Sequence, residues 1–301
     1  MLKKLGAFIL RSRLHASLAA LICALLPFIG GWLAAVIVGF VTLRKNFFEG
    51  FLIVLWASLP AIAWAIDGSW LLLMTNGVFG FVAVWLLAGI IKKANSWSLT
   101  VGVSALIGIL AVLAVHLVFG EPHVWWIKQL SAAVSQGSQV LPDTVSADDI
   151  QTAIQHVAPF LTGLQVMAVL LFAIVALIGA RAVEAAVAGK PHLNKELYFI
   201  RIHAMGVVLL VVMGGLAAWG PLIFRDFLPV ILLPFVLAGF SLVHGMVVLK
   251  KMSSIWFFGF YGVVFLSIIY YPPLAFSVVV VAVLDSIFNF RAMKLGKSKT
   301  V

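Results

Sequence analysis

The stretch VVVVAVLDSIFNFRAMKLGKSK, residues 278–299, contains the two features that decide the fold, a long apolar run and a basic cluster directly after it. An α-helix needs about 17–25 apolar residues to cross a bilayer. Lysine and arginine are retained at the cytoplasmic ends of such helices. The same order of apolar run and cations recurs along the chain, and it predicts a helical membrane protein.

The composition supports this interpretation. The chain has 301 residues, of which 64% are hydrophobic and 10% are charged, and its mean hydropathy is +1.18. Soluble domains average about 45–50% apolar and about 25% charged residues, so a soluble protein is excluded. The net charge of +10 is explained by cations kept on the cytoplasmic face, and we expect no nucleic-acid partner. With Cys23 as its one cysteine, the chain can form no intrachain disulfide, and we expect neither a metal nor another cofactor.

About ten apolar segments predict an all-α, polytopic transmembrane helical bundle. We expect residues 1–301 to form a single integral membrane domain. The first two segments are short, and Pro27 to Gly31 break the helix between them, so they form either a tight hairpin or one broken helix. The predicted segments are 14–28, 31–43, 47–66, 70–91, 98–119, 162–181, 201–220, 228–249, 254–270 and 273–289.

The cations decide between these two alternatives. With a hairpin and a cytoplasmic N-terminus, all 20 lysines and arginines except Lys128 and Arg225 fall on the inner side. A single broken span would move the cations that precede it to the outside, against the positive-inside rule. We therefore predict an uncleaved first helix, both termini in the cytoplasm and a location in the bacterial cytoplasmic (inner) membrane.

One hydrophilic stretch, at about 120–161, is predicted to be an insert on the outside. Within it, SADDIQTAIQHVAPF (146–160) has Ser146 as a candidate N-cap and Asp149 three residues later, as in a capping box. We expect a short helix on the outer surface, or alternatively a lid over an outward-facing pocket. Asp226 is predicted to lie in another outside turn.

Asp285 lies near the end of the last span, where an unpaired carboxylate is costly. Asn289 follows on the same helical face, whereas Arg291 points elsewhere on an ideal helix. The partner of Asp285 is therefore expected on another helix. Asp285 serves either as an ion pair that fixes the last helix or as part of a polar site or a proton-coupled gate.

Two groups of polar residues are candidates for ligand binding or gating, and the alternative for each is an ordinary structural role. A third group, an alanine row on the first helix, is a candidate for docking a partner protein or for packing within the bundle. The inner candidates are Asp285, Asn289, Arg201, His203, His244 and Glu49. The outer candidates are Asp67, Asn76 and His116. The docking candidates are Ala16, Ala20 and Ala24.

The chain resembles a known family in two stretches. These are LLPFIGGWLAAVIVGFVTLRKNFFEGF (25–51) and YYPPLAFSVVVVAVLDSIFNFR (270–291). It resembles the YybS-like bacterial membrane proteins, which are distantly similar to the S-components of energy-coupling-factor transporters. The resemblance implies a small-molecule-binding, transport-related protein without a motor, which docks to a transmembrane coupling protein through small residues such as Ala16, Ala20 and Ala24. S-components have fewer spans than are predicted here.

The sequence leaves several functions open. The first is a transport component that binds an unknown small molecule, with the bilayer and a coupling protein or a second copy as partners. The alternative is a non-catalytic membrane scaffold or assembly factor. An intramembrane enzyme would need several acid, base or metal groups at one depth. The chain has few such groups and no P-loop, HExxH or GxSxG motif, so we expect no enzyme.

Overall fold

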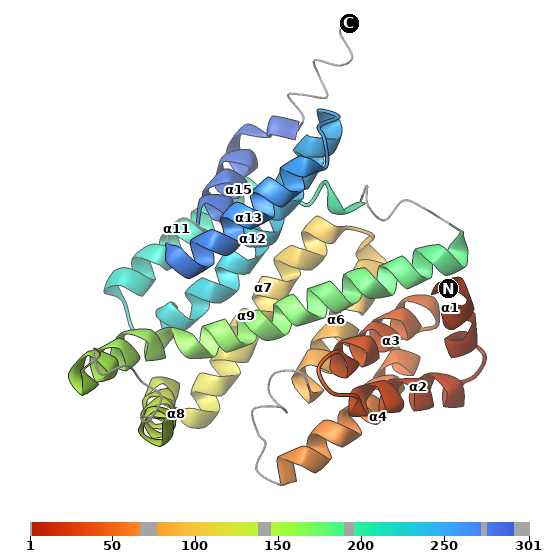
Figure 1. Ribbon diagram of the computed structural model, residues 1–301, viewed down its shortest axis with the longest axis horizontal. Coiled ribbons are helices and arrows are strands. Elements are labelled where there is room, and N and C mark those ends of the chain that lie inside the picture. Colours follow the sequence, from red (N-terminus) through yellow and green to blue (C-terminus); the bar gives the residue numbers. More distant parts are fainter. Residues whose placement is uncertain (1, 67–76, 138–145, 190–195, 272–275, 292–301) are drawn as a thin grey trace, which may run out of the picture. The chain divides into compact units, whose positions relative to one another are not determined.

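The computed structural model describes residues 2–66, 77–137, 146–189, 196–271 and 276–291, and in these residues it is all-helical, with twelve helices and no strand (Figure 1). The helices are α1 (Leu2–Leu10), α2 (Arg13–Leu25), α3 (Gly30–Arg44), α4 (Phe47–Ile66), α6 (Val78–Ala94), α7 (Trp97–Phe119), α8 (Pro122–Gly137), α9 (Ala147–Ala188), α11 (Ala204–Trp219), α12 (Ile223–Leu249), α13 (Ile255–Tyr270) and α15 (Ser277–Phe288). The predicted all-α class is confirmed.

The chain divides into two compact units. Unit 1 contains Met1–Ser104, Ala168–His203 and Pro234–Val301, and unit 2 contains Ala105–Met167 and Ala204–Leu233. Helices α7, α9 and α12 contribute residues to both.

The helices have the length and composition of a membrane protein. Among the described residues, α4, α7, α9 and α12 include apolar stretches long enough to cross a bilayer. Five further apolar helices are shorter. Each of the ten predicted segments contains a helix, but only these four are long enough to span by themselves, so the predicted number of spans is not confirmed.

The first two segments form separate helices, α2 and α3, which pack against each other as the hairpin alternative predicts. Ser12 caps α2 by accepting a hydrogen bond from the His15 N–H. Between the helices, Phe28 adopts a positive φ of 58°, which reverses the chain before α3 begins at Gly30. A Cβ at Gly30 would collide with the Cys23 carbonyl, so the turn requires glycine there.

Small residues let the helices of unit 1 approach closely. A Cβ on Gly39 of α3 would lie 2.9 Å from the Ala180 side chain of α9, and one on Gly179 would lie 2.9 Å from the Val36 side chain. Around this contact, large apolar side chains such as Phe40 and Leu177 are fully buried. The core of unit 1 therefore includes α3 and the second half of α9.

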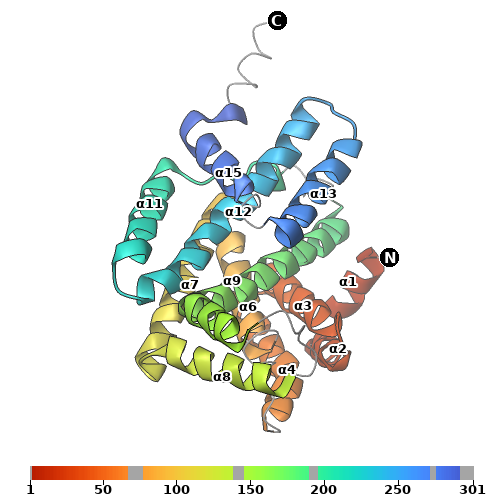
Figure 2. The same cartoon turned by 60° about the vertical axis from the view of Figure 1, so that its left-hand side comes forward.

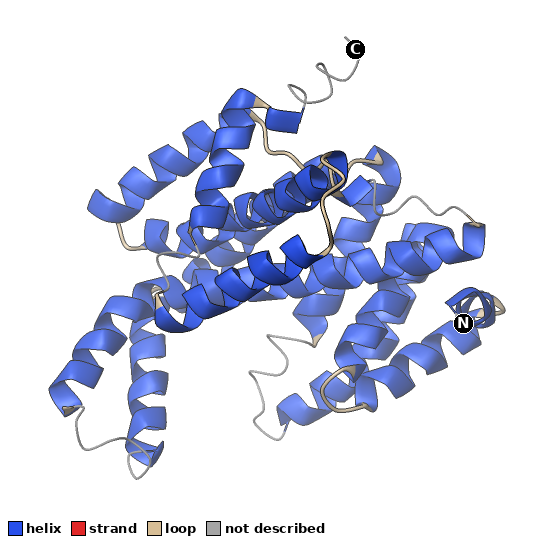
Figure 3. Ribbon diagram, turned by 45° about the horizontal axis from the view of Figure 1, so that its top comes forward, coloured by secondary structure: helices blue, strands red, loops and turns tan. Residues whose placement is uncertain are grey.

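The predicted outside insert is more helical than expected. Ser146 and Asp149 form the predicted capping pair. Ser146 Oγ donates a 2.7 Å hydrogen bond to Asp149 Oδ2 and accepts a 3.1 Å hydrogen bond from the Asp149 N–H. The helix that starts here is not a short surface helix, because it continues as α9 to Ala188. Helix α8 precedes it, and the two run side by side in Figure 3, joined by a 3.2 Å hydrogen bond from Ser131 to Gln151.

Candidate functional site

Asp226 is a buried carboxylate held by two other helices of unit 2. It lies in the first turn of α12 and its side chain is 2% exposed. Its Oδ2 is 2.9 Å from Nε2 of His116 on α7, whose side chain is 15% exposed. Its Oδ1 accepts a 2.8 Å hydrogen bond from the Gly163 N–H of α9. The positive end of the α12 dipole also favours a negative charge at this position.

The local sequence of α9 explains this close contact. Pro159, one turn before Gly163, lacks an N–H and interrupts the ladder of helical hydrogen bonds. A Cβ on Gly163 would collide with the carbonyl oxygen of Asp226. The glycine therefore allows the backbone of α12 to lie directly on α9.

A second hydrogen bond ties α8 to the same region. The indole N–H of Trp126 donates to Thr162 Oγ1, 3.1 Å away, and Thr162 is buried next to Gly163. Four helices of unit 2 thus contribute polar groups around Asp226. The imidazole of His116 is partly exposed, whereas the carboxylate of Asp226 is buried.

Asp226 is the functional candidate that the sequence missed. It was expected in an outside turn, but α12 begins at Ile223, five residues before the predicted segment, and draws Asp226 into its first turn. The signal that could have placed Asp226 in the helix is the preference of acidic residues for the first helical turn. His116 was among the predicted candidates, and its partner is 110 residues away in the chain.

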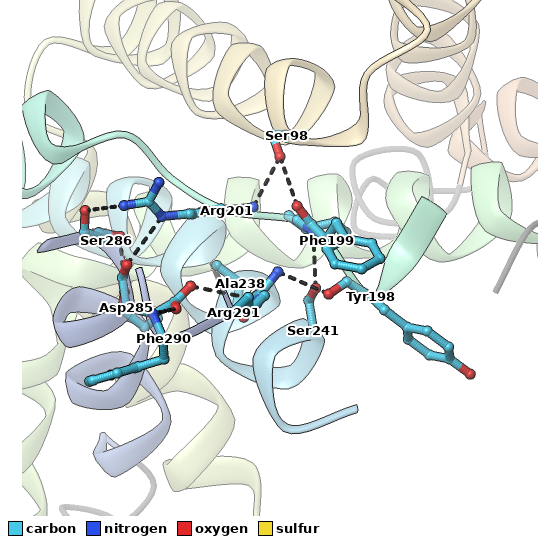
Figure 4. Close-up of polar contacts among 12 residues, drawn as sticks. Ser98, Tyr198, Phe199, Arg201, Ala238, Ser241, Asp285, Ser286, Phe290 and Arg291 are labelled. Atoms are coloured by element: carbon cyan, nitrogen blue, oxygen red, sulfur yellow. Dashed lines mark hydrogen bonds and ion pairs between the residues drawn. The ribbon is translucent and has the colours of Figure 1, made fainter. Parts of the chain in front are cut away.

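Asp285 forms the second buried carboxylate site, in unit 1 (Figure 4). Its Oδ1 accepts a 3.0 Å hydrogen bond from the Phe290 N–H, and its Oδ2 is 3.5 Å from Nη2 of Arg291. The expectation that Arg291 points away is wrong. Helix α15 ends at Phe288, and Asn289, with a φ of 52°, reverses the chain so that Arg291 returns to Asp285.

Arg291 also donates hydrogen bonds to two backbone carbonyls. Its Nη1 donates to the Tyr198 carbonyl at 2.9 Å and its Nη2 to the Ala238 carbonyl at 3.4 Å. Arg291 is 4% exposed. Burial lowers the pKa of its guanidinium from the ordinary value, and the charge of Asp285 opposes that shift.

Arg201, one of the inner candidates, contacts the backbone of Asp285 and not its carboxylate. Its Nε donates to the Asp285 carbonyl at 3.1 Å and its Nη2 to the Ser286 carbonyl at 2.8 Å. The last carbonyls of a helix lack partners within the helix, and a cation there is favoured by the dipole. Arg201 therefore caps the C-terminal end of α15.

Two serines fix the backbone that carries Arg201. Ser241 Oγ donates to the Leu197 carbonyl at 2.6 Å and accepts from the Ile200 N–H at 3.1 Å. Ser98 Oγ accepts from the Arg201 N–H at 3.0 Å. With these bonds, the groups around Asp285 are used to hold chain segments together, which is a structural arrangement.

The predicted inner cluster does not assemble as one site. Glu49 forms an ion pair with Arg13 of α2. His203 is exposed, directly before α11. Arg201 is the inner candidate that hydrogen-bonds to the backbone of Asp285. The outer candidates Asp67 and Asn76 lie outside the described residues.

His244 belongs to an aromatic cluster instead. Its Nδ1 is 2.9 Å from the Phe240 carbonyl, which can only accept, so Nδ1 carries the hydrogen. Its Nε2 then accepts from the Tyr261 hydroxyl at 3.2 Å. Its ring stacks on Phe257 at 4.6 Å. These contacts satisfy both ring nitrogens and account for a histidine in an apolar helix.

The alanine row of α2 is occupied by packing within the chain. Ala16, Ala20 and Ala24 are buried, and α2 packs against α3 and α4. A separate partner would have to use the opposite, exposed face of the helix. That face presents Leu14, Leu18, Ile22 and Leu25.

This packing predicts the effect of enlarging the row. Ala20→Leu is expected to lower the stability of the purified protein by about 1–3 kcal/mol, because the helices leave no room for the added methylenes. Ile22→Ala on the exposed face is the control, with an expected change within about 0.5 kcal/mol. Unfolding in mixed micelles measures both. An unchanged Ala20→Leu variant would show that the row is open to a partner.

No protein-family model matches the chain, and neither curated proteins nor solved structures give a match. In the part of the chain that the structure describes, no group of three or more His, Cys, Asp or Glu side chains could hold a metal ion. Function is therefore inferred from the buried carboxylates. Asp226 and His116 carry polar groups that can hydrogen-bond to a ligand, whereas Asp285 is held by backbone and arginine contacts.

Proposed function

We propose that the chain is a transport-related membrane protein that binds a small molecule within its helical bundle and has no motor of its own. The observation that supports this is the His116–Asp226 pair. Three of the four helices with long apolar stretches, α7, α9 and α12, supply its polar groups. Ionisable side chains inside membrane segments are costly and typically belong to substrate or proton pathways.

The proposal includes a topology. The apolar segments support about ten spans, and the distribution of lysine and arginine supports both termini in the cytoplasm. A place in the bacterial cytoplasmic membrane is what the resemblance to YybS-like bacterial proteins implies. In this topology His116 and Asp226 lie near the outer ends of their helices. A resemblance to YybS-like proteins and to S-components agrees with an outward-facing ligand site and with a coupling protein as a partner.

Native mass spectrometry of the purified protein, after incubation with a bacterial metabolite extract, tests the proposal. The wild type is expected to retain a small molecule. Asp226→Asn is expected to weaken this binding at least tenfold, which corresponds to about 1.4 kcal/mol for a lost charged hydrogen bond. Asp148→Asn, an exposed acid in the first turn of α9, is the matched control and should bind like the wild type.

The outcomes separate the possibilities. Equal retention by the wild type and Asp226→Asn would show that the site is elsewhere. His116→Gln keeps a hydrogen-bond donor at this position and should fold like the wild type. Weaker ligand binding by this folded variant would therefore come from the change at the site and not from unfolding. If the wild type retains no molecule, the transport proposal fails.

A non-catalytic scaffold or assembly factor is the second candidate. The observation that favours it is the Asp285 site, where the carboxylate and both arginines contact other chain segments of the same unit. A scaffold needs such fixed contacts and no ligand. Failure of all variants to bind a small molecule, with normal folding, is the result that this function predicts.

A further inference from the structure

Helix α1 divides into three strips with different chemistry. One strip packs on unit 1, because Gly6 and Ile9 are buried and a Cβ on Gly6 would lie 3.2 Å from both Phe40 and Val183 side chains. The second strip is apolar and uncovered, with Leu2 47%, Leu5 50% and Phe8 46% exposed. The third strip carries the exposed cations Lys3 and Lys4.

The length of α1 excludes a membrane crossing. Its nine residues form a helix of about 14 Å, less than half of the hydrocarbon thickness. The chain turns at Ser12, which caps α2, so α1 does not extend the apolar helix that follows it (Figure 2). A short helix with one apolar and one basic strip is suited to the plane of the membrane interface.

The surroundings of α1 are basic. It contacts α3 at Phe40, one turn before the exposed Arg44. Lys92 of α6 donates to the Lys45 carbonyl at 2.9 Å, which brings the end of α6, with the exposed Lys93, to the same end of α3. The acid in the first turn of α4, Glu49, is already paired with Arg13.

We propose that α1 binds anionic phospholipid, with Leu2, Leu5 and Phe8 among the acyl chains and Lys3, Lys4 and Arg11 on the headgroup phosphates. An uncovered apolar strip beside a surplus of cations matches a lipid that offers acyl chains and a negative phosphate together. The binding is independent of any transported molecule. It fixes the N-terminal helix against the bilayer at the cation-rich end of unit 1.

Lipid-selective quenching tests the proposal on the full-length protein in vesicles. A Leu5→Cys variant in a Cys23→Ser background carries a fluorescent label on α1. Vesicles of phosphatidylcholine then contain either spin-labelled phosphatidylglycerol or spin-labelled phosphatidylcholine as the quencher. We expect severalfold stronger quenching by the anionic lipid, and we expect salt to reduce the difference.

Removal of the cations supplies the decisive comparison. Lys3→Gln with Lys4→Gln is expected to remove most of this severalfold preference for the anionic lipid. Lys250→Gln with Lys251→Gln, another pair of adjacent exposed lysines, should leave it unchanged. Equal quenching by both lipids, or equal preference in both double variants, would overturn the proposal. A label that neither lipid quenches would also overturn it, because α1 would then lie in water.

Discussion

Asp285→Ala is expected to lower the stability of the purified protein by about 3–5 kcal/mol. The substitution leaves the Arg291 guanidinium, 4% exposed, without its carboxylate, and leaves the Phe290 N–H without its acceptor. A buried charge that has lost its partner is costly in a medium of low dielectric constant. Unfolding by SDS in mixed micelles gives the free-energy difference. Asp148→Ala, which removes an exposed acid, is the control and should stay within about 0.5 kcal/mol.

Two further variants locate the origin of this loss. Asp285→Asn keeps an acceptor for the Phe290 N–H and should lose less stability than Asp285→Ala. The double variant Asp285→Ala with Arg291→Met removes the uncompensated charge, so its loss should be smaller than the sum of the single losses. If Asp285→Ala folds with wild-type stability, Asp285 is free for another role and the structural interpretation is wrong.

The helices were predictable because hydropathy and chain reversal are local properties. The expected segment 254–270 coincides with α13, Ile255–Tyr270, and the expected segment 98–119 with α7, Trp97–Phe119. The hairpin at the start was predictable from Pro27 and the two glycines that follow. The number of spans was not predictable in this way: among the described residues, four helices are long and apolar enough to cross a bilayer, and five further apolar helices are shorter.

The partner of Asp285 was not predictable by helical periodicity. Six positions along an ideal helix separate Arg291 from Asp285 by a large angle, but the helix ends three residues after Asp285. Asn289 then enters the left-handed region, which asparagine adopts more readily than most residues. Asn289 was expected to continue the same helical face. Its tendency to end a helix was the signal that predicts the turn.

The two buried aspartates, Asp226 and Asp285, lie at opposite ends of their helices, and this explains their different surroundings. Asp226 lies at the start of α12, where the helix dipole stabilises its negative charge. Its partners there are the His116 side chain and the Gly163 N–H. Asp285 lies at the end of α15, where the dipole opposes its charge. Two arginines compensate there, one at the carboxylate and one at the last carbonyls. Asp226 is thus paired with a histidine that is partly exposed, whereas Asp285 is paired with an arginine that is buried.

Gly163→Ala is expected to lower stability by about 3 kcal/mol and to disrupt the His116–Asp226 site. The added methyl would collide with the Asp226 carbonyl oxygen, and backbone cannot move aside as the end of a flexible side chain can. Separation of α9 from α12 also breaks the 2.8 Å hydrogen bond from the Gly163 N–H to the carboxylate. Unfolding in mixed micelles measures the loss.

Gly214→Ala is the matched control in the same unit, because nothing lies within 4 Å of the Cβ that it adds to α11. Its stability should be unchanged or higher by up to about 1 kcal/mol, since alanine favours the helix. Asp226→Asn combined with Gly163→Ala should cost less than the sum of the two changes, because both act on one contact. Additive losses, or a Gly163→Ala variant as stable as Gly214→Ala, would show that α9 and α12 do not meet at Asp226 as described, and the proposed site would lose its geometric basis.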